Sequence, residues 1–365
     1  MSLETFPLTT LGAAAETVVQ RVKPKQIIRH EPGLYFGLPE EAYFADDALG
    51  STDLKRLLIS PADFWDGSLW NPCREDAATR YKTRGTALHT HILIGEEAFH
   101  QRYARALDKD DHPDALITAD DLKRALREIG GAVSGTKDVL IERLTNLSTR
   151  FKIWDLMVAE QVATGKIILP ADDYDRVVRA SAMIKRNPSL ERCFERGMPE
   201  VSVFWEADGV RFRARFDYLR MTSIVDLKSF SNSLDKPIEL AIKSAFWNGR
   251  HDMQASHYLN ARHVARRFIR AGRVFGDVDM DWLNRLAEVD QYSFVFVYHT
   301  LSGATVTRGL QIHPGHMIDG AASVDIGKAI DVYKRHYDVF GEDMWVDMEP
   351  IYDMTDDDIP LWLRA

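Results

Sequence analysis

Residues 200–230, EVSVFWEADGVRFRARFDYLRMTSIVDLKSF, decide the fold. Apolar and polar residues alternate along this stretch with the period of two that is typical of β-strands. Asp208-Gly209 is the strongest short-range signal for a two-residue hairpin turn. If these two residues form the turn, opposed residues have numbers that sum to 417, so Val201 faces Phe216 and Trp205 faces Phe212. One face is then wholly apolar, which supports this register.

A third strand follows after a less distinct link at Met221-Thr222. A two-residue turn there makes opposed numbers sum to 443, which places Asp217 opposite Asp226. Lys228 lies two residues beyond Asp226 and points to the same face. Glu200 faces Asp217 across the first hairpin, so the pattern predicts a row of three carboxylates across three neighbouring strands.

The repulsion between opposed carboxylates in a sheet must be offset by another interaction. Their Cβ atoms lie about 5 Å apart, and two charges at that distance repel by roughly 3 kcal/mol at an effective dielectric constant of about 20. A shared proton, pairing with Arg213 and Arg215, or a divalent cation would relieve the repulsion. Mg²⁺ prefers such oxygen ligands and completes its shell with water and phosphate. The alternative is a ladder of acids and arginines on a solvated face of the sheet.

Composition places few limits on function. The chain has 365 residues, 45% of them hydrophobic, and two cysteines, Cys73 and Cys193, which are too few for an iron-sulfur cluster or a disulfide framework. We expect a cytoplasmic protein without a membrane segment. The net charge is −9, but residues 341–365 hold eight acids and one base, and residues 259–276 hold five arginines and no acid. A polyanion therefore remains an acceptable partner.

The chain divides into five segments. Residues 1–50 form an irregular N-terminal arm, residues 51–109 and 149–340 form two parts of one α/β core, and residues 341–365 form an acidic tail. Residues 110–148 predict a separate helical hairpin, in which Thr118 and Asp121 form a capping box and Gly130-Gly131 ends the first helix. Its leucine spacing and its Ser134-Gly135-x-Lys137 link resemble the SAP motif, a small DNA-binding hairpin. An ordinary inserted hairpin is the alternative.

Five motifs follow one another along the core: GTALH at residues 85–89, Glu200, RFD at 215–217, DLK at 226–228 and Gln254-x-x-x-Tyr258. In this order they resemble the PD-(D/E)XK nuclease superfamily in its RecB-like branch, and most closely the exonuclease VIII (RecE-like) group of phage and prophage recombination nucleases. The resemblance spans residues 50–300 with the SAP-like segment as an insertion. It implies a restriction-endonuclease-like core, in which helices flank a mixed central sheet.

The resemblance also implies roles for individual residues. His89, Asp217 and Asp226 would be metal ligands, and Lys228 would be the catalytic lysine. Glu200 is added from the strand register and is less firmly part of the family pattern. Gln254 and Tyr258, four residues apart on a helix, would meet the DNA strand. The remaining candidates for contact with DNA are Arg215, Lys137, Arg262 and Arg266.

The expected activity is Mg²⁺-dependent hydrolysis of DNA, with Mn²⁺ as a substitute. The resemblance favours a 5′-to-3′ exonuclease that acts on duplex ends and leaves single strands for an annealing protein. Relatives form rings that thread DNA, and the sequence leaves a homo-oligomer open. A nicking or structure-specific endonuclease with the same site is one alternative, and a non-catalytic DNA-binding protein is another.

Overall fold

A computed structural model describes residues 26–74, 80–300 and 303–363. Within them, a seven-stranded sheet has the order β7-β1-β4-β5-β6-β8-β9. The pairs β1–β7 and β6–β8 are parallel and the others are antiparallel, so the sheet is mixed. The strands are β1 (Gly33–Tyr35), β4 (Gly197–Ala207), β5 (Val210–Arg220), β6 (Ser223–Phe230), β7 (Val274–Phe275), β8 (Ser293–Thr300) and β9 (Thr307–Ile312).

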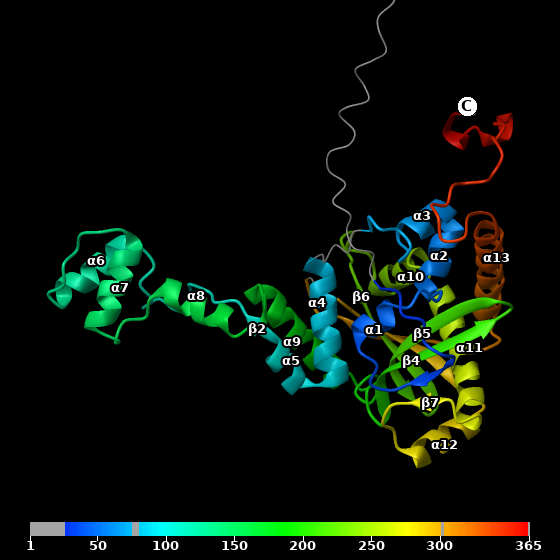
Figure 1. The fold of residues 1–365 in the computed structure, drawn as a ribbon, viewed down its shortest axis with the longest axis horizontal. Helices are drawn as coiled ribbons and strands as arrows, with labels where there is room; N and C mark the ends of the chain where they lie inside the picture. Colours follow the sequence, from blue (N-terminus) through cyan, green and yellow to red (C-terminus); the bar gives the residue numbers. More distant parts are fainter. Residues whose placement is uncertain (1–25, 75–79, 301–302, 364–365) are drawn as a thin grey trace, which may run out of the picture.

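Helices cover both faces of this sheet (Figure 1). One face carries the larger hydrophobic core and packs against α11, behind which lie α2 and α13. The other face carries a smaller core and packs against α4 and α9. The helices of the body are α1 (Glu40–Phe44), α2 (Ser51–Ile59), α3 (Pro61–Asp66), α4 (Arg80–His89), α5 (Glu96–Arg102), α9 (Ala171–Arg186), α10 (Ile238–Asn248), α11 (His251–Arg270), α12 (Met280–Glu288) and α13 (Met317–Phe340). The predicted mixed sheet flanked by helices is confirmed.

Both predicted hairpin registers are confirmed. Asp208 and Gly209 have φ angles of 50° and 76°, as a turn with two left-handed central residues requires. Val201 pairs with Phe216 and Trp205 pairs with Phe212. In the second hairpin Tyr218 pairs with Val225 and Leu219 with Ile224, and the numbers of each pair sum to 443.

Strands β4 and β5 change face at Glu200 and Asp217. Val201 and Phe216 lie in the larger core, and Met198 and Leu219, three residues further along each strand, pack there too. Strict alternation would place residues three apart on opposite faces, so each strand twists once between these positions. Glu200 carries the distortion, because its φ angle of 54° is left-handed, which is unfavourable for a residue other than glycine.

The N-terminal arm is more ordered than we predicted. Residues 1–25 lie outside the described part of the chain. Strand β1, however, joins the sheet between β7 and β4, and Leu34 is fully buried in the larger core. A three-residue strand was not recognised because it is too short to show a hydrophobic period.

The segment inserted between the two parts of the core forms an arm that projects from the body (Figure 1). It contains α6 (Ala119–Glu128), α7 (Lys137–Leu147) and α8 (Trp154–Ala163), and β2 (Tyr103–Arg105) pairs with β3 (Ile167–Leu169) at its base. The helical hairpin has a hydrophobic core of its own, built on Leu122, Leu126, Leu140 and Leu144. A bridge between Leu116 and Ile153 brings its two ends together. The predicted capping box is present, since Thr118 Oγ1 accepts from Asp121 N at 3.2 Å.

The acidic tail is not wholly solvated. Trp345 is 1% exposed and packs against Phe64, Trp70 and Tyr333 from α3, the following loop and α13. Its indole nitrogen donates to Gly341 O at 2.9 Å. The tail is therefore anchored near its beginning by Trp345, whereas most of the residues around and beyond it are exposed. No described helix combines the length and apolar character needed to cross a bilayer.

Candidate active site

The predicted site lies where β5 and β6 separate. Counted from the turn, the last backbone pair of these two strands is Tyr218 with Val225. One residue further on, Asp217 Oδ2 accepts a hydrogen bond from Leu227 N at 2.9 Å. The Asp217 side chain thus takes the place of a backbone hydrogen-bond acceptor between the two strands. Side chains from both faces of the sheet reach the opening that results.

Asp226 is the most deeply buried member of the site, with 1% of its surface exposed. Gln254 Nε2, from α11, donates to its Oδ1 at 2.7 Å. Lys228 Nζ lies 2.8 Å from Oδ2, which makes a close ion pair. Among the described residues Oδ2 accepts no hydrogen bond, so its close contact with the ammonium is an ion pair only. This oxygen is well suited to a cation.

His89 approaches from the other face of the sheet. Its Nε2 lies 3.2 Å from Leu227 O, and because a carbonyl only accepts, Nε2 must carry the proton. Nδ1, which then bears the lone pair, lies 3.6 Å from Asp217 Oδ2. Burial and then the charge of Lys228 lower the pKa of His89, which keeps the imidazole neutral. Two electron-rich atoms therefore face each other across a gap that a proton or a cation would stabilise.

The acids of the site repel one another. Burial and then the charge of Asp226 raise the pKa of Asp217 well above its usual value. Burial and then the charge of Asp217 raise the pKa of Glu200. A bound divalent cation would offset this repulsion between carboxylates. In the described ranges, however, no three His, Cys, Asp or Glu side chains are close enough together to form a complete metal site. Mg²⁺ does not need such a cage, since one or two carboxylates and substrate phosphate often hold it.

At one end of the predicted row of three carboxylates, Glu200 is near enough to Asp217 to be affected by its charge but is paired with an arginine. Glu200 Oε2 accepts from Arg215 Nε at 2.5 Å, because its left-handed backbone turns it toward that guanidinium. Arg215 also donates to Leu38 O and lies over the ring of Tyr43. Both side chains are thereby committed to internal contacts, and the prediction that Arg215 binds DNA is not supported.

Gln254 and Tyr258 share a face of α11, as predicted, but they point into the protein. Gln254 is 6% exposed and holds Asp226. Tyr258 packs edge-on against Phe216 and Phe294. Contact of Gln254 with DNA stays a prediction, and in this structure its amide orients the carboxylate of Asp226.

Arg262 and Arg266, in the arginine-rich part of α11, are held by contacts within the protein. Arg262 is 1% exposed, donates to Leu286 O at 2.7 Å and lies over the ring of Tyr292. Arg266 donates to Ala287 O, and its guanidinium pairs with Asp290. These arginines bind carbonyls at the end of α12, where the helix dipole favours cations. Lys137, in the arm, is partly exposed and pairs with Asp155 at 2.5 Å.

Lys55 is a member of the site that we did not predict. Its Nζ donates to Gly249 O at 2.8 Å, next to the start of α11. Burial and then the charge of Lys228 lower the pKa of Lys55 to about 8, so two ammonium groups lie close together. The sequence held a signal, because Lys55 lies four residues after Ser51 and three before Leu58, on the buried side of its helix.

His251 lies near the ammonium groups of Lys55 and Lys228. Its Nδ1 lies 2.5 Å from Tyr298 Oη, which itself stands opposite Lys228 in the parallel pair β6–β8. Burial lowers the pKa of His251 to about 3, and the charges of Lys228 and Lys55 act in the same direction. A neutral imidazole here avoids adding a third positive charge.

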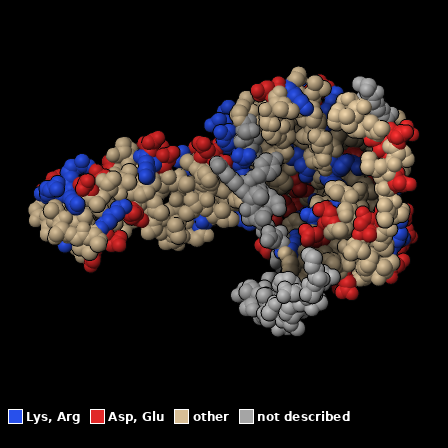
Figure 2. Space-filling view, turned by 90° about the horizontal axis from the view of Figure 1, so that it is seen from above, with Lys and Arg blue, Asp and Glu red and all other residues tan. Residues whose placement is uncertain are grey.

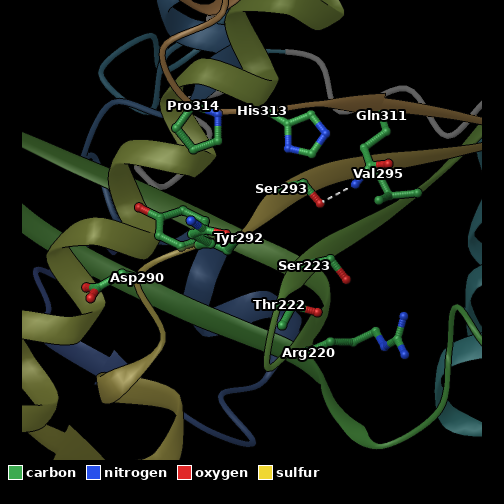
Figure 3. Close-up of a pocket in the computed structure, with 11 residues that line it drawn as sticks. Arg220, Thr222, Ser223, Asp290, Tyr292, Ser293, Val295, Gln311, His313 and Pro314 are labelled. Carbon is green, nitrogen blue, oxygen red and sulfur yellow. Dashed lines mark hydrogen bonds between the residues drawn. The ribbon is translucent and has the colours of Figure 1, made fainter.

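A separate pocket lies outside the candidate site. It has a volume of about 700 Å³ and opens beside the β5–β6 turn and the start of β8, where Arg220, Thr222, Ser293, Gln311 and His313 line it (Figure 3). Gln311 donates to Ser293 Oγ at 2.7 Å within it. Asp226 and Lys228 lie further along β6, so this pocket is not part of the candidate site.

Comparison with known proteins identifies the arm. Residues 116–147 match the model of the SAP domain. The arm carries a SAP domain. No curated protein matches the chain. Among solved structures, a protein from Eubacterium rectale that is provisionally described as an exonuclease superposes with a TM-score of 0.44 and 12% identity, over 82% of this chain and 88% of its own. At that score the likeness does not define a shared fold family.

Proposed function

We propose that this protein is a metal-dependent deoxyribonuclease of the PD-(D/E)XK type. One observation carries the proposal: Asp217, Asp226, Lys228 and His89, which are up to 139 positions apart in the sequence, meet in the opening between β5 and β6. A solvated ladder of acids and arginines would not bury Asp226 or raise the pKa of Asp217.

Asp217 and Asp226 would hold Mg²⁺, with His89 Nδ1 beside it. When bound, the cation would polarise a phosphodiester and lower the pKa of a water molecule. Two further side chains of the protein contribute to the proposed reaction. Gln254 fixes the orientation of Asp226, and the ammonium of Lys228 offsets the negative charge that develops on the phosphate during hydrolysis.

The SAP domain provides a second contact with the substrate. Figure 2 shows basic and acidic side chains interspersed over the arm, at a distance from the body. A duplex that spans the arm and the body would be held at two places, which suits an enzyme that must position a DNA end. We therefore infer an exonuclease on duplex ends, and 5′-to-3′ polarity follows from the family resemblance alone.

One assay tests this function against its rivals. Linear and covalently closed circular duplexes are incubated with Mg²⁺, with Mn²⁺ or with EDTA. We expect loss of linear DNA only, and only with a metal. Cutting of closed circles would instead indicate an endonuclease, and binding without cleavage under either metal would indicate a DNA-binding protein without catalytic activity.

Lys55 should contribute to phosphate binding. We expect Lys55→Gln to weaken duplex binding about tenfold, because it removes a cation that would contact the backbone. Binding by the wild type should also weaken as the pH rises above about 8, where Lys55 loses its proton, and the variant should lack this component. Fluorescence anisotropy with a labelled duplex at pH 7 and pH 9 measures both effects.

Two control variants accompany this experiment. Lys55→Arg keeps the charge and should retain most of the affinity, and Lys243→Gln removes an exposed lysine that pairs with Glu239. Equal affinities for Lys55→Gln and Lys243→Gln would show that Lys55 does not contact the substrate.

Removal of the SAP domain should lower the affinity for long DNA duplexes and leave the rate of hydrolysis of short duplexes nearly unchanged. Because Leu116 and Ile153 are bridged, residues 116–153 can be replaced by a short glycine-serine link without opening the body. We expect affinity for long duplexes to fall about tenfold or more and to depend less steeply on salt. Hydrolysis of short duplexes at saturating concentration should change less than twofold. A loss of activity on both substrates, with the body still folded, would contradict this division of roles.

A further inference from the structure

A second pocket opens beside the candidate site, on the face of the sheet that carries the smaller core. It has a volume of about 520 Å³ and lies between the end of α9 and the loop that leads into β4. Its apolar part is formed by Ile92, Ile184 and Phe194, which also pack into the smaller core. Pockets of this volume bind small molecules in other proteins, so the pocket is large enough for one nucleotide.

Charged side chains line the rest of this pocket. Three are cations, Lys185, Arg192 and Arg196, and two are acids, Glu191 and Glu195. Three cations against two acids leave one net positive charge. Arg192 lies 3.9 Å from Glu191. Guanidinium and ammonium groups together favour a phosphate, and carboxylates can accept hydrogen bonds from the exocyclic amino groups of bases.

The hydroxyl of Ser181 is the observation that points to a ligand. Ser181 is 1% exposed and lines the pocket, and within the described ranges its Oγ has no hydrogen-bond partner. A buried hydroxyl without a partner is costly, and a polar atom of a ligand would offset that cost. Ser181 and Lys185 lie four residues apart on α9, so one face of the helix supplies both a hydroxyl and an ammonium.

The pocket lies next to the candidate metal ligands. Ile92 follows His89 by three residues in one continuous helical run, which widens to a π-helix immediately after His89. Such π segments are frequent at functional sites. On the other side, the ring of Phe194 packs edge-on against that of Tyr218, the neighbour of Asp217, with 5.9 Å between the ring centroids. A ligand in the pocket would therefore lie beside the candidate site without occupying it.

We propose that this pocket binds a nucleoside monophosphate unit, with the base against Phe194 and the phosphate at Lys185 and Arg196. Aromatic side chains bind bases of any sequence by stacking, and the hydroxyl of Ser181 would bond to the polar edge of the base. The unit is either a free mononucleotide or a nucleotide at the end of a DNA strand, which share this chemistry. The pocket itself does not depend on the proposed nuclease function, whereas a strand end as its ligand rests on that function.

Calorimetric titration of the full-length chain with each common deoxynucleoside 5′-monophosphate, in EDTA, tests the site. We expect a Kd of about 0.1 mM, and roughly tenfold weaker binding of inorganic phosphate and of unphosphorylated deoxynucleosides. The double variant Lys185→Gln with Arg196→Gln should weaken binding about tenfold or more, because the phosphate loses two cations. Phe194→Leu should weaken it about tenfold by removing the stacking surface, and Ser181→Ala about fivefold.

Arg186→Gln is the matched control, because this exposed arginine follows Lys185 on α9 but does not line the pocket. It should bind the mononucleotides like the wild type. Circular dichroism should show every variant folded. Since Ser181 has no partner to lose among the residues described, Ser181→Ala should also melt at the temperature of the wild type.

A duplex with a fluorescent adenine analogue at either strand end distinguishes the two sources of the nucleotide. The fluorescence reports whether the labelled base leaves the stack when the protein binds in EDTA. A change that is lost in Phe194→Leu would identify a strand end as the ligand, and binding of mononucleotides without such a change would identify the free nucleotide.

Absence of both responses in the wild type would overturn the proposal. So would equal responses of the wild type and the pocket variants, or binding of inorganic phosphate as tight as that of the mononucleotides. Neither measurement needs a metal or hydrolysis, so failure of this proposal is distinct from failure of the nuclease function.

Discussion

Asp226→Asn should lower the rate of DNA hydrolysis by about 10³-fold or more at saturating Mg²⁺. Asparagine keeps the shape of the side chain, and its carbonyl oxygen can still accept from Gln254. It removes the charge that would bind the cation and that holds Lys228 Nζ at 2.8 Å. Loss of a single preorganised electrostatic contact commonly costs 10²-fold to 10³-fold, and here two are lost together. Initial rates on a linear duplex measure the effect.

Lys228→Met tests the other half of this pair. It should also reduce the rate by about 10²-fold or more, because no ammonium would then offset charge on the phosphate. Asp325→Asn is the matched control, since that carboxylate pairs with Arg250 and Lys328 outside the site. Circular dichroism should show all three variants folded. If Asp226→Asn and Lys228→Met both retained more than half of the activity, the assignment of the site would be wrong.

Asp217→Asn should stabilise the protein when no metal is bound. The folded-state pKa of Asp217 is raised, so its protonated form favours folding. That contribution is fully present below the unfolded pKa, near 4, and is lost as the pH rises toward the folded pKa. The metal-free wild type should therefore lose stability relative to the variant from about pH 4 upward. Asparagine avoids the loss, because its Oδ1 can still accept from Leu227 N and it never ionises.

Thermal melting in EDTA between pH 5 and pH 8 measures this difference. We expect the Tm of Asp217→Asn to exceed that of the wild type by a few degrees at pH 8, and the gap to narrow toward pH 5. Addition of Mg²⁺ should raise the Tm of the wild type by mass action and that of the variant much less. A gap that widened toward low pH would contradict the sign of the shift, and equal responses to Mg²⁺ would remove Asp217 from the metal site.

Much of the central hairpin was predictable because its signals are local. Asp208-Gly209 adopts the left-handed turn that these residue types favour, and the turn then sets which residues oppose each other. The same holds for the capping box of Thr118 and Asp121. Asp217 and Asp226 could be brought together from the sequence because both registers rest on turns of two residues.

Other contacts were decided by packing between distant segments. Glu200 lies at a position where alternation predicts a carboxylate beside Asp217, yet a left-handed backbone turns it to Arg215. Arg262 and Arg266 form a basic stripe in the sequence, but the end of α12 covers them. Lys55 reaches the site only because α2 packs against α11. A period of 2 or 3.6 specifies which face a side chain occupies, and it says nothing about which helix lies against that face.

By itself, therefore, the sequence determined the three central strands, the registers of their two hairpins and the proximity of Asp217 and Asp226, since these follow from turns and alternation within about thirty residues. Only the tertiary structure decided where β5 and β6 part, that Gln254 holds Asp226, and that Trp345 anchors the tail. The reason is physical: burial and charge at these positions come from segments far apart along the chain, whose docking depends on the shapes of both surfaces.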